Sequence, residues 1–411
     1  MAKQTSVQAE APPAQSALSR AANSSQKPEV VVLNWQAASN TVLDGKGAWF
    51  NGGRLTQLVI QSDFSNGRWR RPKNFAFTNW KINGSIRILG AGSSASDAVR
   101  QSSFSLGHTE RMQAAAPTGI TLAGLKIKAD EKIPLIVGPG ATNITLKDSK
   151  ISGQSQSVAI YLDAESANHV IQNNTFSLKA DRELIAVDGA KGNLIAGNTF
   201  KRLPWGGVYV YRNCGERGVV RHQEPTDNRI IDNIFNLKTL KSYWEENPKN
   251  GRQFEYRYGV WLGSRQGGRP PGYCGADKGF PFGSSIDNRD FADDNIVSGN
   301  RRIGSNRGYL LKIDEDFGIG GYDKFVRDDG RNNLVTDNRA LDSKNWKSQE
   351  RLPVAPQRVP TRLRGQFEPL PELWSGGAAH DQPRPLEAFE RSCGCGLLGS
   401  DANADLLPAL A

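Results

Sequence analysis

The sequence predicts an all-β fold, a parallel β-solenoid, and three observations support this prediction. A short phrase that closes on asparagine recurs from residue 143, at first about every 25 residues. Glycine supplies 43 of the 411 residues, and the phrases are rich in asparagine and β-branched residues, which disfavour helix. A leucine-rich repeat would need more leucine and a helical turn, and a propeller about four strands per ~40 residues. Each phrase therefore indicates one coil.

Each copy of the phrase begins with asparagine or histidine, continues with apolar residues and ends on a polar residue. We expect the closing side chains to stack from coil to coil inside one buried bend, where their amides bond to backbone. The closing residues are Asp148, Asn174, Asn198, Asn233, Asn300 and Asn338. GITLAG (119–124) is an earlier copy, and the longer spacing of the later copies predicts inserted loops.

A second series of strands lies between the phrases: VAIYLDA (158–164), LIAVDGA (184–190), GVYVYRN (207–213), YGVWLGS (258–264) and YLLKIDE (309–315). With both series, residues 85 to 340 resemble the right-handed parallel β-helix proteins, the pectate-lyase-like group. The resemblance implies a single-stranded right-handed parallel β-helix and a carbohydrate-active protein. It does not select an activity, because this architecture hosts lyases, hydrolases, epimerases and tailspikes.

Composition divides the chain into three parts. Residues 1–27 are rich in Ala, Ser, Gln and Pro and are predicted to be a flexible leader. Residues 28–345 are predicted to form the β-helix with an N-terminal cap, and residues 346–411 an extended segment and tail. The start resembles the leader that follows a cleaved signal peptide, which predicts an exported protein, periplasmic or secreted. No apolar run approaches the ~18 residues of a membrane span.

The chain is basic, with 52 Lys and Arg against 42 Asp and Glu, a net charge of +10 and a pI near 9.4. Such a surface favours acidic partners. The basic residues are scattered singly and in pairs rather than in a tract, which weighs against nucleic acid. The predicted partner is therefore an anionic polysaccharide.

Alternation along the second series predicts one outward-facing stripe, because successive residues of a strand point to opposite faces. In this register Asp163 and Asp188 are stacked carboxylates about 4.8 Å apart. Three interpretations stay open: the acid and nucleophile of a glycosidase, a calcium site, or solvated turn residues. The stripe also contains aromatic residues that sugars could stack on, or that inserted loops could simply cover: Tyr161, Tyr209, Tyr211 and Trp261.

The inserted loops add basic and polar side chains beside this stripe. The first loop contains Arg212, Arg221 and His222, and the second, after Trp261, contains Arg265, Asp287 and Arg289. Arginine pairs a carboxylate bidentately, so the cluster suits an acidic sugar, although any single arginine could be an ordinary loop residue. Cys214 and Cys274 lie in these two loops and are predicted to form a disulfide.

The leading functional prediction is a lyase that acts by β-elimination on a uronate-containing polysaccharide. Arg212, Arg221, Arg265 or a calcium ion at Asp163 and Asp188 would neutralise the uronate, and the base candidates are His222, Tyr211 and Lys312. A C5-epimerase would share the first half-reaction. The alternatives are a glycoside hydrolase that uses Asp163, Asp188 or Asp287, and a non-catalytic carbohydrate-binding or tailspike-like protein. No two histidines have the spacing of zinc ligands.

Overall fold

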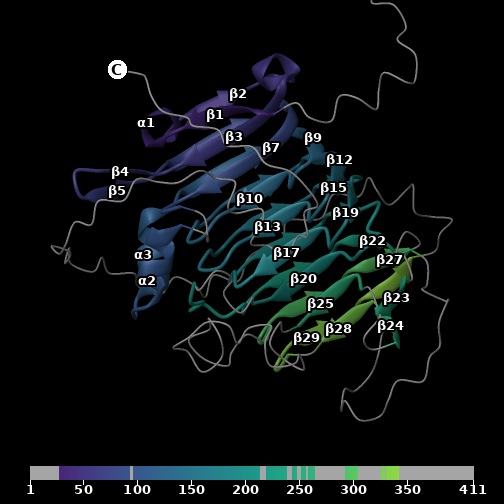
Figure 1. Ribbon diagram of the computed structural model, residues 1–411. Coiled ribbons are helices and arrows are strands. Elements are labelled where there is room, and N and C mark those ends of the chain that lie inside the picture. The colour runs from purple at the N-terminus through teal and green to yellow at the C-terminus, as the bar shows by residue number, and fades with distance from the viewer. Residues whose placement is uncertain are drawn as a thin grey trace, which may run out of the picture.

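A computed structural model describes residues 27–92, 96–212, 219–237, 243–247, 251–255, 258–263, 292–303, 325–328 and 330–341. These residues form the right-handed parallel β-helix that the repeats predict. Each coil contributes one strand to each of three rows, and neighbouring coils pair in parallel register (Figure 1). The predicted leader and C-terminal segment lie outside the described residues.

The first row is a separate nine-stranded sheet, and the second and third rows are joined through long strands. The first row contains β2 (Val42–Asp44), β6 (Lys73–Thr78), β8 (Thr118–Ala123), β11 (Thr145–Lys147), β14 (Val170–Gln172), β18 (Leu194–Ala196), β21 (Arg229–Ile231), β26 (Ile296–Ser298) and β29 (Leu334–Thr336). The second row contains β9 (Lys126–Glu131), β12 (Lys150–Ser155), β15 (Thr175–Phe176), β16 (Lys179–Ala180), β19 (Thr199–Phe200), β22 (Ile234–Asn236), β27 (Arg301–Ile303) and β30 (Arg339–Leu341).

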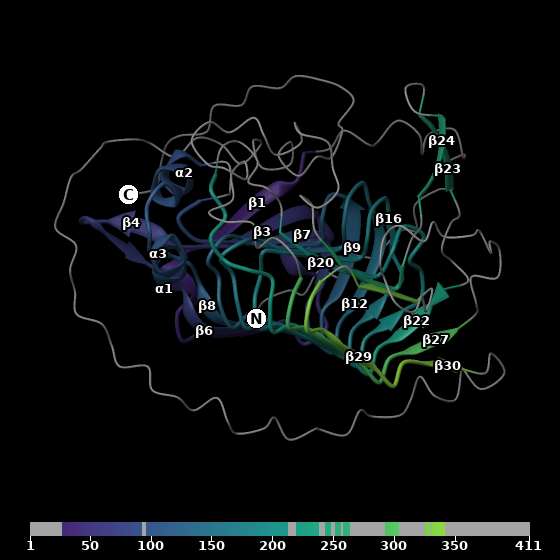
Figure 2. The same ribbon diagram turned by 90° about the horizontal axis from the view of Figure 1, so that it is seen from below.

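The third row follows the second in each coil and carries the candidate site. It contains β1 (Glu29–Leu33), β3 (Leu55–Gln61), β10 (Leu135–Val137), β13 (Ile160–Leu162), β17 (Ile185–Asp188), β20 (Val208–Tyr211), β25 (Val260–Leu262) and β28 (Val326–Asp328). β7 (Lys81–Leu89) begins in the second row, where it pairs with β9, and ends in the third, where it pairs with β10. Figure 2 shows the three rows on different sides of the interior.

Short helices and two hairpins interrupt the coils. α1 (Trp35–Ala38) and the 3₁₀ turn η2 (Phe50–Gly53) lie in the first coils, and α2 (Asp97–Ser103) and α3 (His108–Ala115) are inserted between β7 and β8. The side chain of Ser96 caps α2 by accepting a hydrogen bond from the Val99 backbone N–H. The hairpins are β4–β5 (Asp63–Ser65, Arg68–Arg70) and β23–β24 (Tyr243–Asn247, Gly251–Glu255). No helix in the described part of the chain is long and apolar enough to cross a membrane.

Alternation along the short strands directs apolar side chains from each of the three rows into the interior, where equivalent positions stack from coil to coil. Phe176, Phe200 and Phe235 occupy equivalent positions on successive coils, with ring centroids 4.9 and 4.6 Å apart. Phe325 meets Phe235 edge to face, with ring centroids 5.0 Å apart. All four are fully buried, and each removes enough apolar surface from water to contribute about 1.5–3 kcal/mol.

The predicted asparagine stack is confirmed at the bend between the first and second rows. The backbone N–H of each asparagine donates to the side-chain oxygen of the next, from Asn174 to Asn198 at 2.9 Å and from Asn198 to Asn233 at 2.9 Å. Asn300 and Asn338 continue the stack. The place given to Asp148 is wrong: Asp148 is exposed in a left-handed turn at φ 52°, and Ser149 donates its N–H to Asn174 instead. The first copy of the phrase is offset by one residue.

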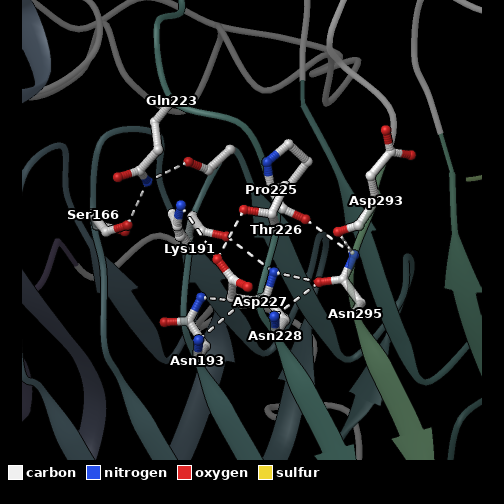
Figure 3. A network of polar contacts seen from close by, with 12 residues as sticks. Ser166, Lys191, Asn193, Gln223, Pro225, Thr226, Asp227, Asn228, Asp293 and Asn295 are labelled. Carbon is white, nitrogen blue, oxygen red and sulfur yellow. Dashed lines mark hydrogen bonds and ion pairs between the residues drawn. The ribbon is translucent and has the colours of Figure 1, made fainter. Parts of the chain in front are cut away.

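A second ladder occupies the bend between the third and first rows. Its members are the first residues of the phrases, namely His169, Asn193, Asn228, Asn295 and Asn333, linked by N–H donation to the next side-chain oxygen at 2.7 to 3.1 Å. Figure 3 shows Asn193, Asn228 and Asn295 in line, with Gln223 alongside. His169 is fully buried in this ladder, and its Nδ1 accepts from the Ile144 N–H at 3.2 Å.

Candidate functional site

The predicted register of the third row is correct. Tyr161 pairs with Ala186, Ala186 with Tyr209, and Tyr209 with Trp261, so these side chains share the face that points away from the β-helix interior. The prediction that this stripe is exposed is wrong for much of its length. Tyr161, Asp163, Asp188 and Tyr211 are buried, and only Tyr209 and Trp261 keep intermediate exposure.

The stripe is buried because other parts of the chain pack on it. Tyr161 and Tyr211 form a small outer cluster with Ile133, Ile136 and Val158, separate from the main core. The rings of Tyr209 and Trp261 meet edge to face at 5.3 Å. Loops that cover aromatic residues were one of the open interpretations, and for Tyr161 and Tyr211 covering is what the structure contains.

Residues 219–226, referred to below as the covering segment, lie over the polar end of this face. Helices α2 and α3 hold the segment in place: the Val220 N–H donates to the Ser103 hydroxyl at 2.9 Å, and Nε2 of His222 lies 2.8 Å from the Ser103 carbonyl oxygen. The rings of His108 and His222 lie 5.1 Å apart. A carbonyl oxygen can only accept, so His222 carries its proton on Nε2.

Arg221 of the covering segment reaches Asp163, with Nη1 3.4 Å from Oδ1 and both side chains buried. The same oxygen accepts from the Ala164 N–H at 2.8 Å, whereas Oδ2 is buried without a hydrogen-bond partner. Burial raises the pKa of Asp163 to about 7; Arg221 opposes this rise, and the neighbouring charge of Asp188 adds to it. Asp163 therefore holds a proton for a large part of the time near neutral pH.

Leu162 and Val187 are register partners on adjacent strands, and Asp163 and Asp188 are the residues that follow them in sequence. The two aspartates therefore lie one rung apart. The hydroxyl of Tyr161 donates a short hydrogen bond to Oδ2 of Asp188. The two carboxylates thus differ in their surroundings: Asp163 has a guanidinium and one unpartnered oxygen, and Asp188 has a phenol.

Tyr211 and Arg212 occupy enclosed positions. The Tyr211 hydroxyl donates to Glu183 at 3.0 Å and accepts from Arg182 at 2.9 Å, so both of its hydrogen-bonding roles are filled. Arg212 is fully buried, and its Nη1 reaches the carbonyl oxygen of His222 at 3.4 Å.

Burial, with His222, Arg221 and Arg111 nearby, lowers the pKa of His108 to about 3.

Glu165 is the site residue that sequence reasoning missed. Its carboxylate accepts the N–H groups of His222 at 2.8 Å and Gln223 at 3.1 Å, and a short bond from the Thr109 hydroxyl. It is buried and holds φ at 63°, an uncommon conformation for a residue other than glycine. Its place two residues after Asp163 was the available signal. The contact from Thr109 of α3 joins residues more than fifty positions apart in sequence, and no sequence pattern indicated it.

The remaining predicted residues lie outside the described part of the chain. These are Arg265, Asp287, Arg289, Lys312, Cys214 and Cys274. The disulfide between Cys214 and Cys274 stays a prediction that thiol titration of the unfolded, unreduced protein can test. Among the described residues, no group of three or more His, Cys, Asp or Glu side chains is arranged to hold a metal ion. Arg221 supplies the positive charge beside Asp163 that the calcium hypothesis assigned to an ion.

Comparison with known proteins agrees with this fold. The family model described as right handed beta helix region matches residues 121–262, about a third of the chain, and a search of curated proteins found no match. The chain is similar to a tailspike protein of E. coli bacteriophage HK620 at 12% identity and TM-score 0.35, covering 76% of this chain and 51% of that one. It thus spans about half the length of that tailspike.

Two other solved structures are similar at the same level. An alginate lyase from Paenibacillus sp. str. FPU-7 is 12% identical, with TM-score 0.30 and coverage of 78% of this chain and 94% of that one. The mannuronan C-5 epimerase AlgE6 A-module of Azotobacter vinelandii is 13% identical, with TM-score 0.18 and coverage of 77% and 89%. The chain is a right-handed parallel β-helix protein.

Proposed function

We propose that the protein is an enzyme that hydrolyses glycosidic bonds in an anionic polysaccharide, with Asp163 and Asp188 as the catalytic carboxylates. One observation carries the proposal: two carboxylates lie on adjacent rungs, and burial raises the pKa of one of them to about 7. A pair of carboxyl groups in unlike surroundings is what acid and nucleophile require. The rung spacing of ~4.8 Å is close to the ~5–5.5 Å separation in retaining glycosidases.

In this mechanism Asp163 gives its proton to the glycosidic oxygen as the bond from that oxygen to the sugar C1 breaks. The Asp188 carboxylate bonds to C1 on the opposite face, and Tyr161 orients it by hydrogen bonding. Water then replaces Asp188 at C1, and Asp163 takes up the water proton, which restores both groups. Because Asp163 is fully buried, the covering segment has to move away for the substrate to reach it.

The substrate class follows from charge and from the exposed end of the stripe. Tyr209 and Trp261 keep intermediate exposure and offer ring faces and edges to a sugar. The net charge of +10 favours a polyanion.

β-Elimination is the second candidate, and the buried guanidinium of Arg221 favours it, since a uronate carboxylate must be neutralised. The described base candidates fit less well. Tyr211 is bonded to Glu183 and Arg182, and His222 donates Nε2 to a carbonyl group. Lys312, the third candidate, lies outside the described residues. Epimerisation at C5 would need the same base.

The test is a screen of acidic and neutral polysaccharides, with and without a calcium chelator, that measures new reducing ends and absorbance near 232 nm. Hydrolysis predicts reducing ends without absorbance, whereas a lyase generates both. On the responding polymer, Asp163→Asn and Asp188→Asn should each lower kcat by about 10²- to 10⁴-fold.

Asp181→Asn is the matched control, because Asp181 is an exposed aspartate of the coil that contains Asp188. It should keep wild-type turnover. Product absorbance at 232 nm in the wild type, or full activity in both active-pair variants, would contradict the hydrolytic proposal.

A further inference from the structure

The bend between the first and second rows carries a column of lysines on its outer surface. Lys81, Lys126 and Lys150 are the first residues of β7, β9 and β12, and they are direct register partners on three successive rungs. Rungs lie ~4.8 Å apart, so the three ammonium groups leave the same surface at neighbouring positions. Like charges placed directly opposite each other on adjacent strands destabilise a sheet.

Among the described residues, no carboxylate forms an ion pair with a lysine of this column, namely Lys81, Lys126 or Lys150. Within the described part of the chain the same holds for Lys46, which lines a hollow beside them, although its backbone hydrogen bond and its charge help to lower the pKa of Asp44. The nearby Asp44 is turned to the Lys46 backbone N–H at 2.9 Å and to the Asn79 side chain at 3.0 Å. The ammonium groups of the column are thus left for solvent or a ligand.

The column borders an open hollow of about 330 Å³. Three lysines, Lys46, Lys81 and Lys126, line it together with Asn79, Trp80 and two glycines. The glycine Gly124 adopts φ +63°, and a Cβ there would lie 2.4 Å from the Asn79 side-chain oxygen. A larger residue would therefore clash with Asn79 at this edge of the hollow. Trp49 extends the surface: it is the bridge partner of Lys81, 47% exposed, with the Lys81 ammonium 6.0 Å from its ring.

We propose that this hollow and the lysine column form a binding site for an anionic polysaccharide strand, separate from the Asp163 and Asp188 pair. The lysines bind carboxylate or sulfate groups on successive sugars, and the exposed indole ring of Trp49 contacts the apolar face of a sugar. A repeating ligand fits a repeating column, because each rung presents one ammonium. The choice of a polysaccharide over another polyanion rests on the proposed function.

This site lies on a different part of the coil from the candidate active site. The lysines begin the second row, whereas Asp163 and Asp188 come after strands of the third row. The part of a polysaccharide chain that binds the lysine column is therefore not the part that contacts Asp163 and Asp188. Its role is to retain the polymer on the enzyme between cleavage events.

The experiment measures binding of the full chain to sodium polygalacturonate, chondroitin sulfate, neutral dextran and a DNA duplex by titration calorimetry over a range of salt concentrations. Lys81→Gln/Lys126→Gln/Lys150→Gln is compared with Lys27→Gln/Lys73→Gln/Lys179→Gln, which removes three exposed lysines elsewhere and gives the same net charge. The first triple variant should weaken polyanion binding about tenfold or more and flatten its salt dependence. The control should change it less than about twofold.

Equal losses in the two triple variants would overturn the proposal, because only net charge would then matter. So would DNA binding as tight as polyanion binding with the same loss in the first variant, since the ligand would then be a nucleic acid. Turnover at saturating polymer separates this site from the proposed function. The first triple variant keeps wild-type kcat if the two sites are independent, and lysine-dependent binding without any hydrolysis would sink only the proposed function.

Discussion

The two bend ladders and the third-row network are both buried and polar, yet they are built in opposite ways. In the ladders each coil supplies one side chain in the same place, an asparagine at every linked position except Ser149 and His169, and this side chain accepts from the backbone of its neighbour. In the third-row network, Asp163 and Glu165 come from one coil and Arg221 from an inserted segment, and one oxygen of Asp163 has no partner.

This difference distinguishes buried polar groups that stabilise the fold from buried polar groups suited to catalysis. The asparagines of the ladders lose little by being buried, because their backbone N–H groups meet side-chain acceptors. In the third-row network, burial of Asp163 outweighs the opposing charge of Arg221 and raises the pKa of Asp163, which favours its protonated form. Buried polar groups at a cost to stability are expected where a protein does chemistry.

Removal of a ladder residue should have the largest effect on stability. Asn233 accepts the N–H and a side-chain N–H of Asn198, and its amide donates to Ile195 and Asn300. Asn233→Ala leaves these groups buried and unpaired and should lower the free energy of unfolding by about 3 kcal/mol or more. Urea titration measures this loss. Gln172→Ala, in β14 of the first row, is the control. An equal small loss of stability in both variants would show that the ladder contributes no more than an ordinary strand residue.

Removal of Arg221 should have a smaller effect that depends on pH. The folded-state pKa of Asp163 is raised from 3.8 to about 7, so the stability contributed by this group falls as pH rises from 3.8 through 7. Without Arg221 the pKa rises further. Arg221→Met should therefore lose about 2 kcal/mol at pH 8 and less at pH 5, where Asp163 is protonated in both proteins. A loss that is the same at both pH values would contradict the assignment.

His169 offers the smallest effect and the opposite sign. Of the five linked residues of the second ladder, His169 is the one that is not asparagine. Its Nε2 is buried without a partner. Burial lowers its pKa to about 3. His169→Asn should add about 0.5–1 kcal/mol at pH 7.5.

The gain from His169→Asn should be larger at pH 4.5. A histidine with a lowered folded-state pKa contributes stability above pH 6.5, and this contribution is lost as pH falls from 6.5 towards 3. Asparagine carries no such dependence. Thermal unfolding at the two pH values measures the difference, and a variant that is less stable at both would show that the imidazole is required.

The sequence predicted what the repeats encode and little else of the site. Period, register and the stacking of Asn174 and its equivalents follow from a pattern that each coil restates. The covering of the third row was not predictable in the same way, because it depends on α2, α3 and the covering segment meeting across more than a hundred residues, as in the bond from Val220 to Ser103. Alternation gave the direction of Asp163 and Tyr161 correctly, but alternation does not say what lies above a strand.

The proposed mechanism requires that burial keep a proton on Asp163 near neutral pH. Carboxyl ¹³C chemical shifts of protein labelled at aspartate measure this directly, with Asp163→Asn identifying the resonance. The account predicts a single titration of Asp163 centred near pH 7, and its shift to higher pH in Arg221→Met. A midpoint near the ordinary aspartate value of about 3.9 would contradict this requirement, and with it the role of Asp163 as the acid.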